Sequence, residues 1–304
     1  MAPARKKTLL FLLKLLFSSG ALYVVFMKAG PHDVLGLMKS ITPWSFVSAV
    51  ALYLAAQFLS SVRWMFLLPT RMGLVRLFRL YMLGSFFGTF LPGLVSGDAV
   101  KAYYLYRETA KGAEALSSTF MDRYIGFAAL MALGTLAYPL GFRYLRGSWI
   151  QWTLPALVVL FVLASFLFFR LRLGRRIGVL RDAYGIFPVY LKDSGLMAKT
   201  FLLSVAVQAL GIFAVYILAG GLGRHLPLWS LFIFLPIVIT LSALPVSVSG
   251  LGIREASMVL LLGAVGVSPA AATAISLAWM LSVITGSLAG LFEYFRGRDN
   301  PVPT

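Results

Sequence analysis

Six long apolar runs constrain the fold more than any other feature of this sequence. Each is long enough to cross the hydrocarbon core of a bilayer as a helix, which takes about 20 residues. They lie at residues 8–27, 43–68, 117–141, 151–169, 200–220 and 270–295. Only 12% of the 304 residues are charged, against about 25% in soluble domains. The sequence therefore predicts an all-α polytopic protein that forms a single membrane domain over residues 1–304.

Basic residues predict which side of the membrane each loop faces. They cluster beside the apolar runs, at residues 5–7, 71–79, 101–111, 170–181 and 296–298. Because short cytoplasmic loops carry an excess of Lys and Arg, we expect all five clusters on the cytoplasmic side of the cell membrane. The N- and C-termini belong with them. The loops at 28–42, 142–150 and 221–228 carry fewer basic residues and should face outward.

Two further apolar regions, at about 74–94 and 229–249, are interrupted by Pro and Gly. The basic clusters on either side of the first region belong on the same side of the membrane, although about 20 apolar residues separate them. A re-entrant helical hairpin satisfies both clusters, since irregular backbone is tolerated at that depth when it is buried or lines a cavity. The alternative is eight ordinary helices, with the amphipathic segment 97–115 inside a crossing.

The two interrupted regions share a string of residues. Leu-Pro-Gly-Leu-Val-Ser-Gly at 91–97 and Leu-Pro-Val-Ser-Val-Ser-Gly at 244–250 agree at five of seven positions, 153 residues apart. Two halves, about 1–145 and 146–304, would then each contain three crossings and one hairpin. An odd number of crossings inverts the second half, as in many secondary transporters; the alternative is an old duplication kept for packing. The predicted hairpin breaks are Pro92, Gly97, Pro245, Gly250 and Gly252.

Charged residues flank both predicted hairpins, although a charge at the bilayer centre costs roughly 2.5–3.5 kcal/mol. Cations beside helix N-termini suit a phosphate group. The candidate substrate-binding residues are Asp98, Lys101, Asp122, Arg123, Arg254 and Glu255. The alternative is a set of salt bridges that fix the hairpins, from Asp98 to Lys101 and from Asp122 to Arg123 or Arg254. Arg63 and Glu293, near helix ends, are expected to extend to the interface.

Several classes of function find little support in the sequence. Cysteine is absent and only two histidines occur, so thiol chemistry is excluded and a zinc site is not expected. No Gly-x-x-x-x-Gly-Lys-Ser/Thr motif is present, and we expect neither metal nor cofactor. The net charge of +17 follows from the cytoplasmic loops and the anionic inner leaflet, so nucleic acid is not an expected partner.

Three strings carry a resemblance to a known family. Ser-Gly-Asp-Ala-Val-Lys-Ala-Tyr at 96–103, Met-Asp-Arg-Tyr-Ile-Gly at 121–126 and Pro-Val-Ser-Val-Ser-Gly-Leu-Gly-Ile-Arg-Glu-Ala at 245–256 together resemble the membrane region of lysylphosphatidylglycerol synthases and related stand-alone flippase-like proteins. Gly-Leu-Gly-Ile-Arg-Glu-Ala is the most specific part. Two positions depart from the family pattern: Lys101 stands where an Arg is usual, and no basic residue occurs near Trp279, in the last span.

The resemblance implies a membrane domain that moves phospholipids or lipid-linked anionic head groups between leaflets. Full-length synthases continue into a soluble aminoacyl-transfer domain, whereas this chain ends at Thr304, so transferase activity is not expected here. Membrane lipids are the expected partners, and a second copy or a partner enzyme is compatible with these features. The alternatives are a membrane-embedded enzyme that acts on lipid phosphates, with Asp98, Asp122 or Glu255 as base, and an accessory membrane subunit.

Overall fold

The structure is a computed structural model that describes residues 3–91, 96–171, 181–244, 246–247 and 249–299. Within these ranges the regular structure is helical throughout. The α-helices are α1 (Pro3–Ala29), α2 (Pro31–Lys39), α3 (Pro43–Leu67), α4 (Leu74–Phe90), α5 (Ser96–Thr109), α6 (Gly112–Gly141), α7 (Thr153–Arg170), α8 (Arg181–Tyr184), α9 (Phe187–Lys192), α10 (Ser194–Gly221), α11 (Leu228–Ser242), α12 (Ile253–Gly263) and α13 (Pro269–Asp299). Two short 3₁₀ turns, Phe142–Tyr144 and Trp149–Trp152, precede α7.

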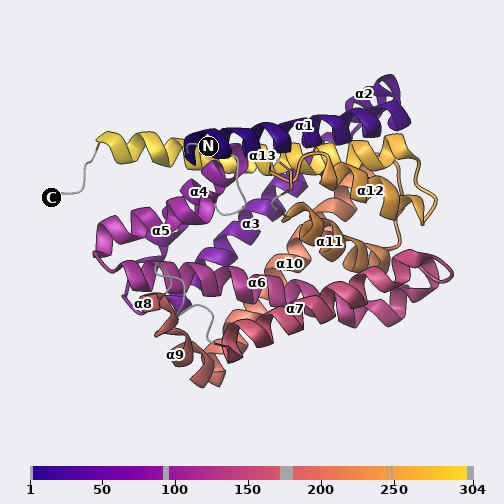
Figure 1. Ribbon diagram of the computed structural model, residues 1–304. Coiled ribbons are helices and arrows are strands. Elements are labelled where there is room, and N and C mark those ends of the chain that lie inside the picture. Colours follow the sequence, from indigo (N-terminus) through magenta and orange to yellow (C-terminus); the bar gives the residue numbers. More distant parts are fainter. Residues whose placement is uncertain (1–2, 92–95, 172–180, 245, 248, 300–304) are drawn as a thin grey trace.

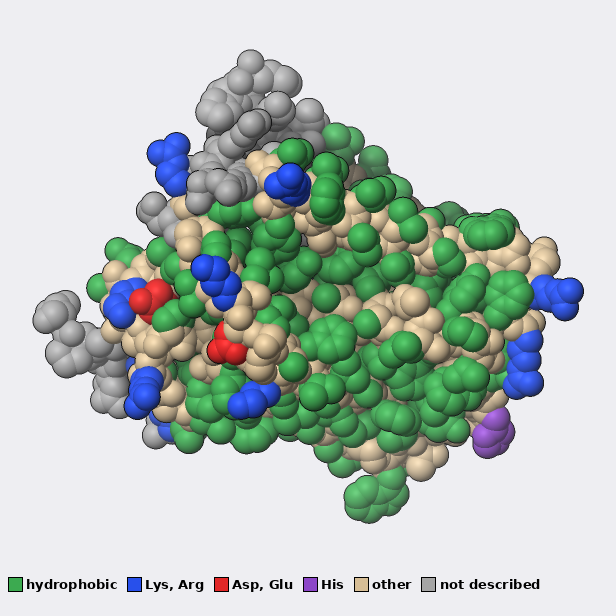
Figure 2. Space-filling model, turned by 90° about the horizontal axis from the view of Figure 1, so that it is seen from below, with side chains coloured by type: hydrophobic (Ala, Val, Ile, Leu, Met, Phe, Trp, Pro, Cys, Tyr) green, Lys and Arg blue, Asp and Glu red, His purple; other side chains and the backbone are tan. Residues whose placement is uncertain are grey.

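Six helices in the described part of the chain are long and apolar enough to cross a membrane: α1, α3, α6, α7, α10 and α13. They coincide with the six predicted spans, so this prediction is confirmed. Seen from below, hydrophobic side chains cover the broad middle of the molecule, and charged side chains gather toward its two ends, most of them on the left (Figure 2). This distribution is the one that a bilayer around the middle requires.

The two interrupted regions each form a pair of short helices. α4 packs against α5, and α11 packs against α12; these helices have 17, 14, 15 and 11 residues. An α5 of 14 residues is only about 21 Å long, too short to cross alone, so the described helices do not support eight ordinary spans. The α4–α5 pair lies toward one end of the molecule and the α11–α12 pair toward the other (Figure 1).

Helices 153 residues apart in sequence occupy corresponding positions in the packing. Shifted by this offset, α3, α4 and α6 fall on α10, α11 and α13. α3 packs along α10, α4 packs on α13, and α11 packs on α6. Each helical pair therefore contacts the long helix that ends the opposite half. These contacts support an inverted repeat, which itself stays a prediction.

Close helix approaches depend on small residues. The hydrogen of Gly290 in α13 faces the backbone of Met82 in α4 so closely that a Cβ there would collide with it, and a Cβ on Gly141 of α6 would collide with Ile233 of α11. The main apolar core surrounds α11, in which nearly every side chain from Ser230 to Val238 is buried. The α11–α12 pair is thus part of the core, whereas α4 and α5 enclose a polar space.

Candidate functional site

The α4–α5 pair is held together by contact between backbones. A Cβ on Gly97 of α5 would collide with the carbonyl oxygen of Gly84 and lie 3.0 Å from the Cα of Gly88. At the open end of the pair, Arg76 of α4 forms an ion pair with Glu108 of α5, with 2.8 Å between Nη2 and Oε1. The hydrogen bonds that Arg76 donates to the Glu108 carboxylate raise the pKa of the Arg76 guanidinium. Gly97 is the second residue of α5 and makes this close contact with α4; its role as a hairpin break stays a prediction.

A buried ion network connects this pair to α3, α6 and α10. Asp122 of α6 accepts a hydrogen bond from Arg63 of α3 at 2.7 Å, one from Lys101 of α5 at 3.1 Å and one from the Tyr81 hydroxyl at 2.8 Å. Arg63 also donates to Ser204 of α10 at 2.8 Å. The side chains of all three ions are at most 5% exposed. Two cations therefore share one carboxylate away from solvent.

This network corrects two expectations from the sequence. Arg63 does not extend to the interface, because its guanidinium is buried against Asp122. Asp122 pairs with Arg63 and Lys101 rather than with Arg123 or Arg254. The reason is geometric: α3 and α6 pack side by side, which brings Arg63 into contact with Asp122 although 59 residues separate the two in sequence.

Lys101 is surrounded by favourable partners. Its Nζ lies 3.7 Å from Asp98 and 3.1 Å from Asp122. It also lies over two aromatic rings, 4.6 Å from the centroid of Trp64 and 4.2 Å from that of Tyr81, where cation–π attraction adds to the ion pairs. The predicted pair between Asp98 and Lys101 is present.

A cavity of about 330 Å³ lies against this network. Its charged lining residues are Asp98, Lys101 and Arg123, which bring three of the six candidate residues together. Arg123 donates a hydrogen bond to Asp98 and remains 52% exposed. It is therefore the cation of this group that a ligand can reach most easily. Asp122 stands behind Lys101, outside the lining.

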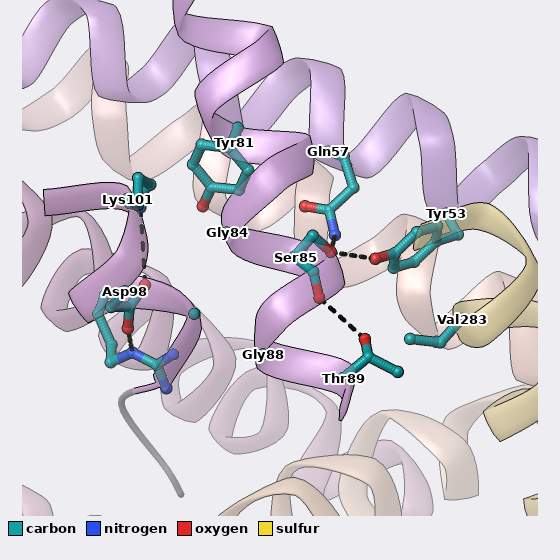
Figure 3. Close-up of a pocket in the computed structure, with 12 residues that line it drawn as sticks. Tyr53, Gln57, Tyr81, Gly84, Ser85, Gly88, Thr89, Asp98, Lys101 and Val283 are labelled. Carbon is teal, nitrogen blue, oxygen red and sulfur yellow. Dashed lines mark hydrogen bonds and ion pairs between the residues drawn. The ribbon is translucent and has the colours of Figure 1, made fainter. Parts of the chain in front are cut away.

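The opposite part of the lining is neutral and polar, and the sequence analysis missed it. Tyr53 and Gln57 of α3 face Ser85 and Thr89 of α4 (Figure 3). Tyr53 and Ser85 share a hydrogen bond, and the Gln57 amide donates to the Ser85 hydroxyl at 2.8 Å. Polar residues spaced four apart in an apolar helix share one face, and this spacing is the signal that could have indicated them.

The remaining two candidate residues form a separate cluster at the start of α12. Glu255 is fully buried and accepts hydrogen bonds from the backbone N–H of Gly252 at 2.8 Å, from Arg254 at 2.5 Å and from Ser276 of α13 at 3.2 Å. Neither Arg254 nor Glu255 lines the cavity. The structure therefore divides the six predicted residues between two clusters.

The connecting segments of the two pairs approach each other. The hydroxyl of Ser249 lies 3.5 Å from the carbonyl oxygen of Leu91. Gly250 and Gly252 have positive φ values of 76° and 83°, backbone angles that favour glycine; that they are the breaks of a re-entrant hairpin stays a prediction. The predicted breaks at Pro92 and Pro245 lie outside the described residues.

The comparison with known proteins agrees with the residue strings. A family model described as the lysylphosphatidylglycerol synthase TM region matches residues 11–290, a segment that contains the whole cavity lining. No curated protein matches the chain. The matched segment covers most of the sequence and includes all six apolar spans, apart from the ends of the first and last. The chain belongs to the lysylphosphatidylglycerol synthase transmembrane-region family, a lipid-related family of multi-pass membrane proteins.

Proposed function

We propose that this protein moves lipids with an anionic, phosphate-bearing head group from one membrane leaflet to the other. The observation that carries the proposal is the polar cavity between α3, α4, α5, α6 and α13. The helices long enough to cross the membrane are otherwise largely apolar. Membership in a lipid-related membrane family supports the same conclusion. Polar and ionisable side chains inside a membrane are energetically costly, and those that face a cavity commonly mark the pathway of a polar substrate.

The charges around the cavity suit a single phosphodiester. Arg63, Lys101 and Arg123 are cationic, while Asp98 and Asp122 are carboxylates, so the cluster carries one net positive charge. In this proposal Arg123 offers several N–H donors to the phosphate, and Lys101 adds a point charge from the cavity wall.

The carboxylates then have positioning roles. Asp98 orients Arg123 toward the cavity, and Asp122 holds Lys101 in place. We assign Arg254 and Glu255 to the second helical pair, which approaches the first at Ser249 and Leu91, rather than to the phosphate itself.

We further propose that the chain is one membrane domain built from two inverted halves, about 1–145 and 146–304, with both helical pairs re-entrant. The gathering of charged side chains toward one end (Figure 2) supports a cell-membrane orientation with that end and both termini in the cytoplasm. Uphill transport would draw on an ion gradient or on a partner protein, because the sequence has no P-loop.

Reconstitution of the purified full chain into liposomes tests this proposal. Acyl-labelled phosphatidylglycerol in the inner leaflet becomes accessible to an outside quencher only when it is translocated. Wild type should translocate it, and Arg123→Gln should slow it strongly. Arg143→Gln removes an exposed arginine outside the cavity and should leave the rate unchanged.

Three results would count against the proposal. Equal rates for wild type and Arg123→Gln would remove the cavity from the mechanism. Release of a reaction product from a lipid phosphate in the same vesicles would favour the alternative of a membrane-embedded enzyme. No exchange of lipid in wild-type vesicles would favour an accessory subunit.

A further inference from the structure

The cavity has a charged part, around Lys101 and Arg123, and a neutral part, around Gln57 and Ser85. The backbone of α4 lies between the two parts. Gly84 and Gly88 lie between Lys101 on one side of α4 and Gln57 on the other (Figure 3). Gly97 of α5 packs against both glycines, and all three line the same cavity as the charged and neutral parts, so one ligand in that cavity can contact both parts. A head group that places its phosphate at Arg123 would extend its free end toward the hydroxyl and amide groups.

The neutral part has hydrogen-bonding capacity to spare. Ser85 is bound by Tyr53 and by the Gln57 amide nitrogen, and Thr89 donates to the Ser85 carbonyl oxygen at 2.9 Å. The Gln57 amide oxygen points away from Ser85 (Figure 3) and has no hydrogen-bond donor among the residues that the structure describes. It is an acceptor for a ligand hydroxyl, and the neighbouring hydroxyl oxygens can accept as well.

The same region lacks a counter-charge for a cationic ligand. Asp98 is the one carboxylate among the described lining residues, and it already contacts Arg123 and Lys101. An ammonium group brought to the neutral part would lose its hydration without gaining an ion pair, which is unfavourable. Hydroxyl groups would exchange water for Gln57, Ser85 and Tyr53 at little cost.

We propose that the cavity selects a phosphodiester head group whose free end is neutral and hydroxylated, such as glycerol or a sugar, over an aminoacylated, cationic one. This inference rests on the proposed function and names its substrate class. A volume of about 330 Å³ lies at the small end of ligand pockets, roughly 300–1,000 Å³, and suits a head group without its acyl chains.

Liposome translocation with three acyl-labelled lipids tests the selection. Wild type should move phosphatidylglycerol about tenfold or more faster than lysyl-phosphatidylglycerol, because the lysyl ammonium finds no partner. Gln57→Leu should slow phosphatidylglycerol about fivefold, the effect of one lost hydrogen bond. Phosphatidic acid, which has the phosphate without the glycerol end, should be unaffected. Gln151→Leu makes the same change outside the cavity and serves as the matched control.

Two further variants keep the test decisive if Gln57→Leu folds poorly. Tyr53→Phe removes only a hydroxyl and should also slow phosphatidylglycerol without slowing phosphatidic acid. Gln57→Glu adds the missing counter-charge and should shift the preference toward lysyl-phosphatidylglycerol.

Each outcome has a distinct meaning. Equal wild-type rates for phosphatidylglycerol and its lysyl derivative would overturn the selection while the proposed function stands. Equal slowing of phosphatidic acid and phosphatidylglycerol by both Gln57→Leu and Tyr53→Phe would show that these residues only support the fold, and would also overturn it. Absence of translocation of all three lipids would defeat the proposed function together with this inference.

Discussion

The two helical pairs use related sequences in different ways. α4 and α5 touch through glycine backbones and, together with α3, α6 and α13, line a polar cavity. α11 is buried in the apolar core, and α12 keeps its charges beside its own first turn. The comparison shows that two segments with a shared string of residues can line a polar cavity in one helical pair and pack into the apolar core in the other.

The partners of the equivalent cations explain this difference. Lys101 and Arg254 lie 153 residues apart. Lys101 finds its carboxylate on another helix, at Asp122, whereas Arg254 pairs with its neighbour Glu255. Next to the position equivalent to Asp122, α13 carries Ser276, which donates to Glu255 at 3.2 Å. The first arrangement ties helices together, and the second stabilises the start of one helix.

The largest effect should come from Asp122→Asn in the first pair. This change leaves Arg63 and Lys101 as buried cations without a carboxylate, and removal of one partner from a buried ion network costs about 3–5 kcal/mol. Denaturant titration of the protein in detergent micelles measures the free energy of unfolding. A loss below about 1 kcal/mol would mean that the network does not stabilise the helix assembly.

Gly97→Val tests the backbone contact between α4 and α5. The new side chain would collide with Gly84 and Gly88, and overpacking of this kind typically costs about 1–3 kcal/mol. Gly263→Ala in the second pair is the contrast, because nothing lies within 4 Å of a Cβ there. It should change stability by at most about 1 kcal/mol, in the stabilising direction. Similar losses in both variants would abolish this distinction between the pairs.

Glu255→Gln should have an intermediate effect of about 1–2 kcal/mol. Glu255 accepts from Gly252 through Oε2 and from Arg254 and Ser276 through Oε1. Gln keeps an acceptor oxygen at only one of these two positions, so the charge opposite Arg254 and one set of acceptor contacts are lost. Because Arg254 is 16% exposed, water can reach it better than it reaches the ions around Asp122. The thermal midpoint of the detergent-solubilised protein measures the change, with Asp122→Asn alongside. A larger drop in the thermal midpoint for Glu255→Gln than for Asp122→Asn would contradict the view that the ion network of the first pair matters more for stability than the cluster of the second.

Asp98→Asn should have the smallest effect on stability and a clear effect on transport. Its partner Arg123 is 52% exposed, and pairs of that kind contribute about 0.2–1 kcal/mol. Translocation of phosphatidylglycerol should nevertheless fall, since Arg123 loses its orientation. Unfolding and liposome assays on the same preparation separate the two effects. Unchanged transport would place Asp98 outside the mechanism.

The spans and the helical pairs could be predicted because they depend on properties read along the chain. The length of an apolar run predicts a crossing, whereas the side that each loop faces stays a prediction from the basic residues. The position of Arg63 near a helix end predicted an exposed side chain. This was wrong, because the sequence of α3 does not reveal which helix packs beside Arg63. The partners of Asp122 were also beyond the sequence, because they depend on packing between α3, α5 and α6.

The neutral part of the cavity was harder to anticipate. Tyr53 and Gln57 are four residues apart, as are Ser85 and Thr89, so each pair lies on one face of its helix. The same spacing also occurs where polar side chains merely bond across helices. Only the three-dimensional arrangement shows that these two faces meet at a cavity, because the residues come from separate helices.

The burial of Arg63 also bears on how the protein is made. Its folded-state partner Asp122 follows 59 residues later, a delay of roughly 3–12 s at synthesis rates of about 5–20 residues per second. During that interval the guanidinium has yet to meet the carboxylate that makes its burial tolerable. We therefore expect α3 to reach its final depth only after the segment of α6 that contains Asp122 has been made, so that these two helices settle in the membrane together rather than one after the other.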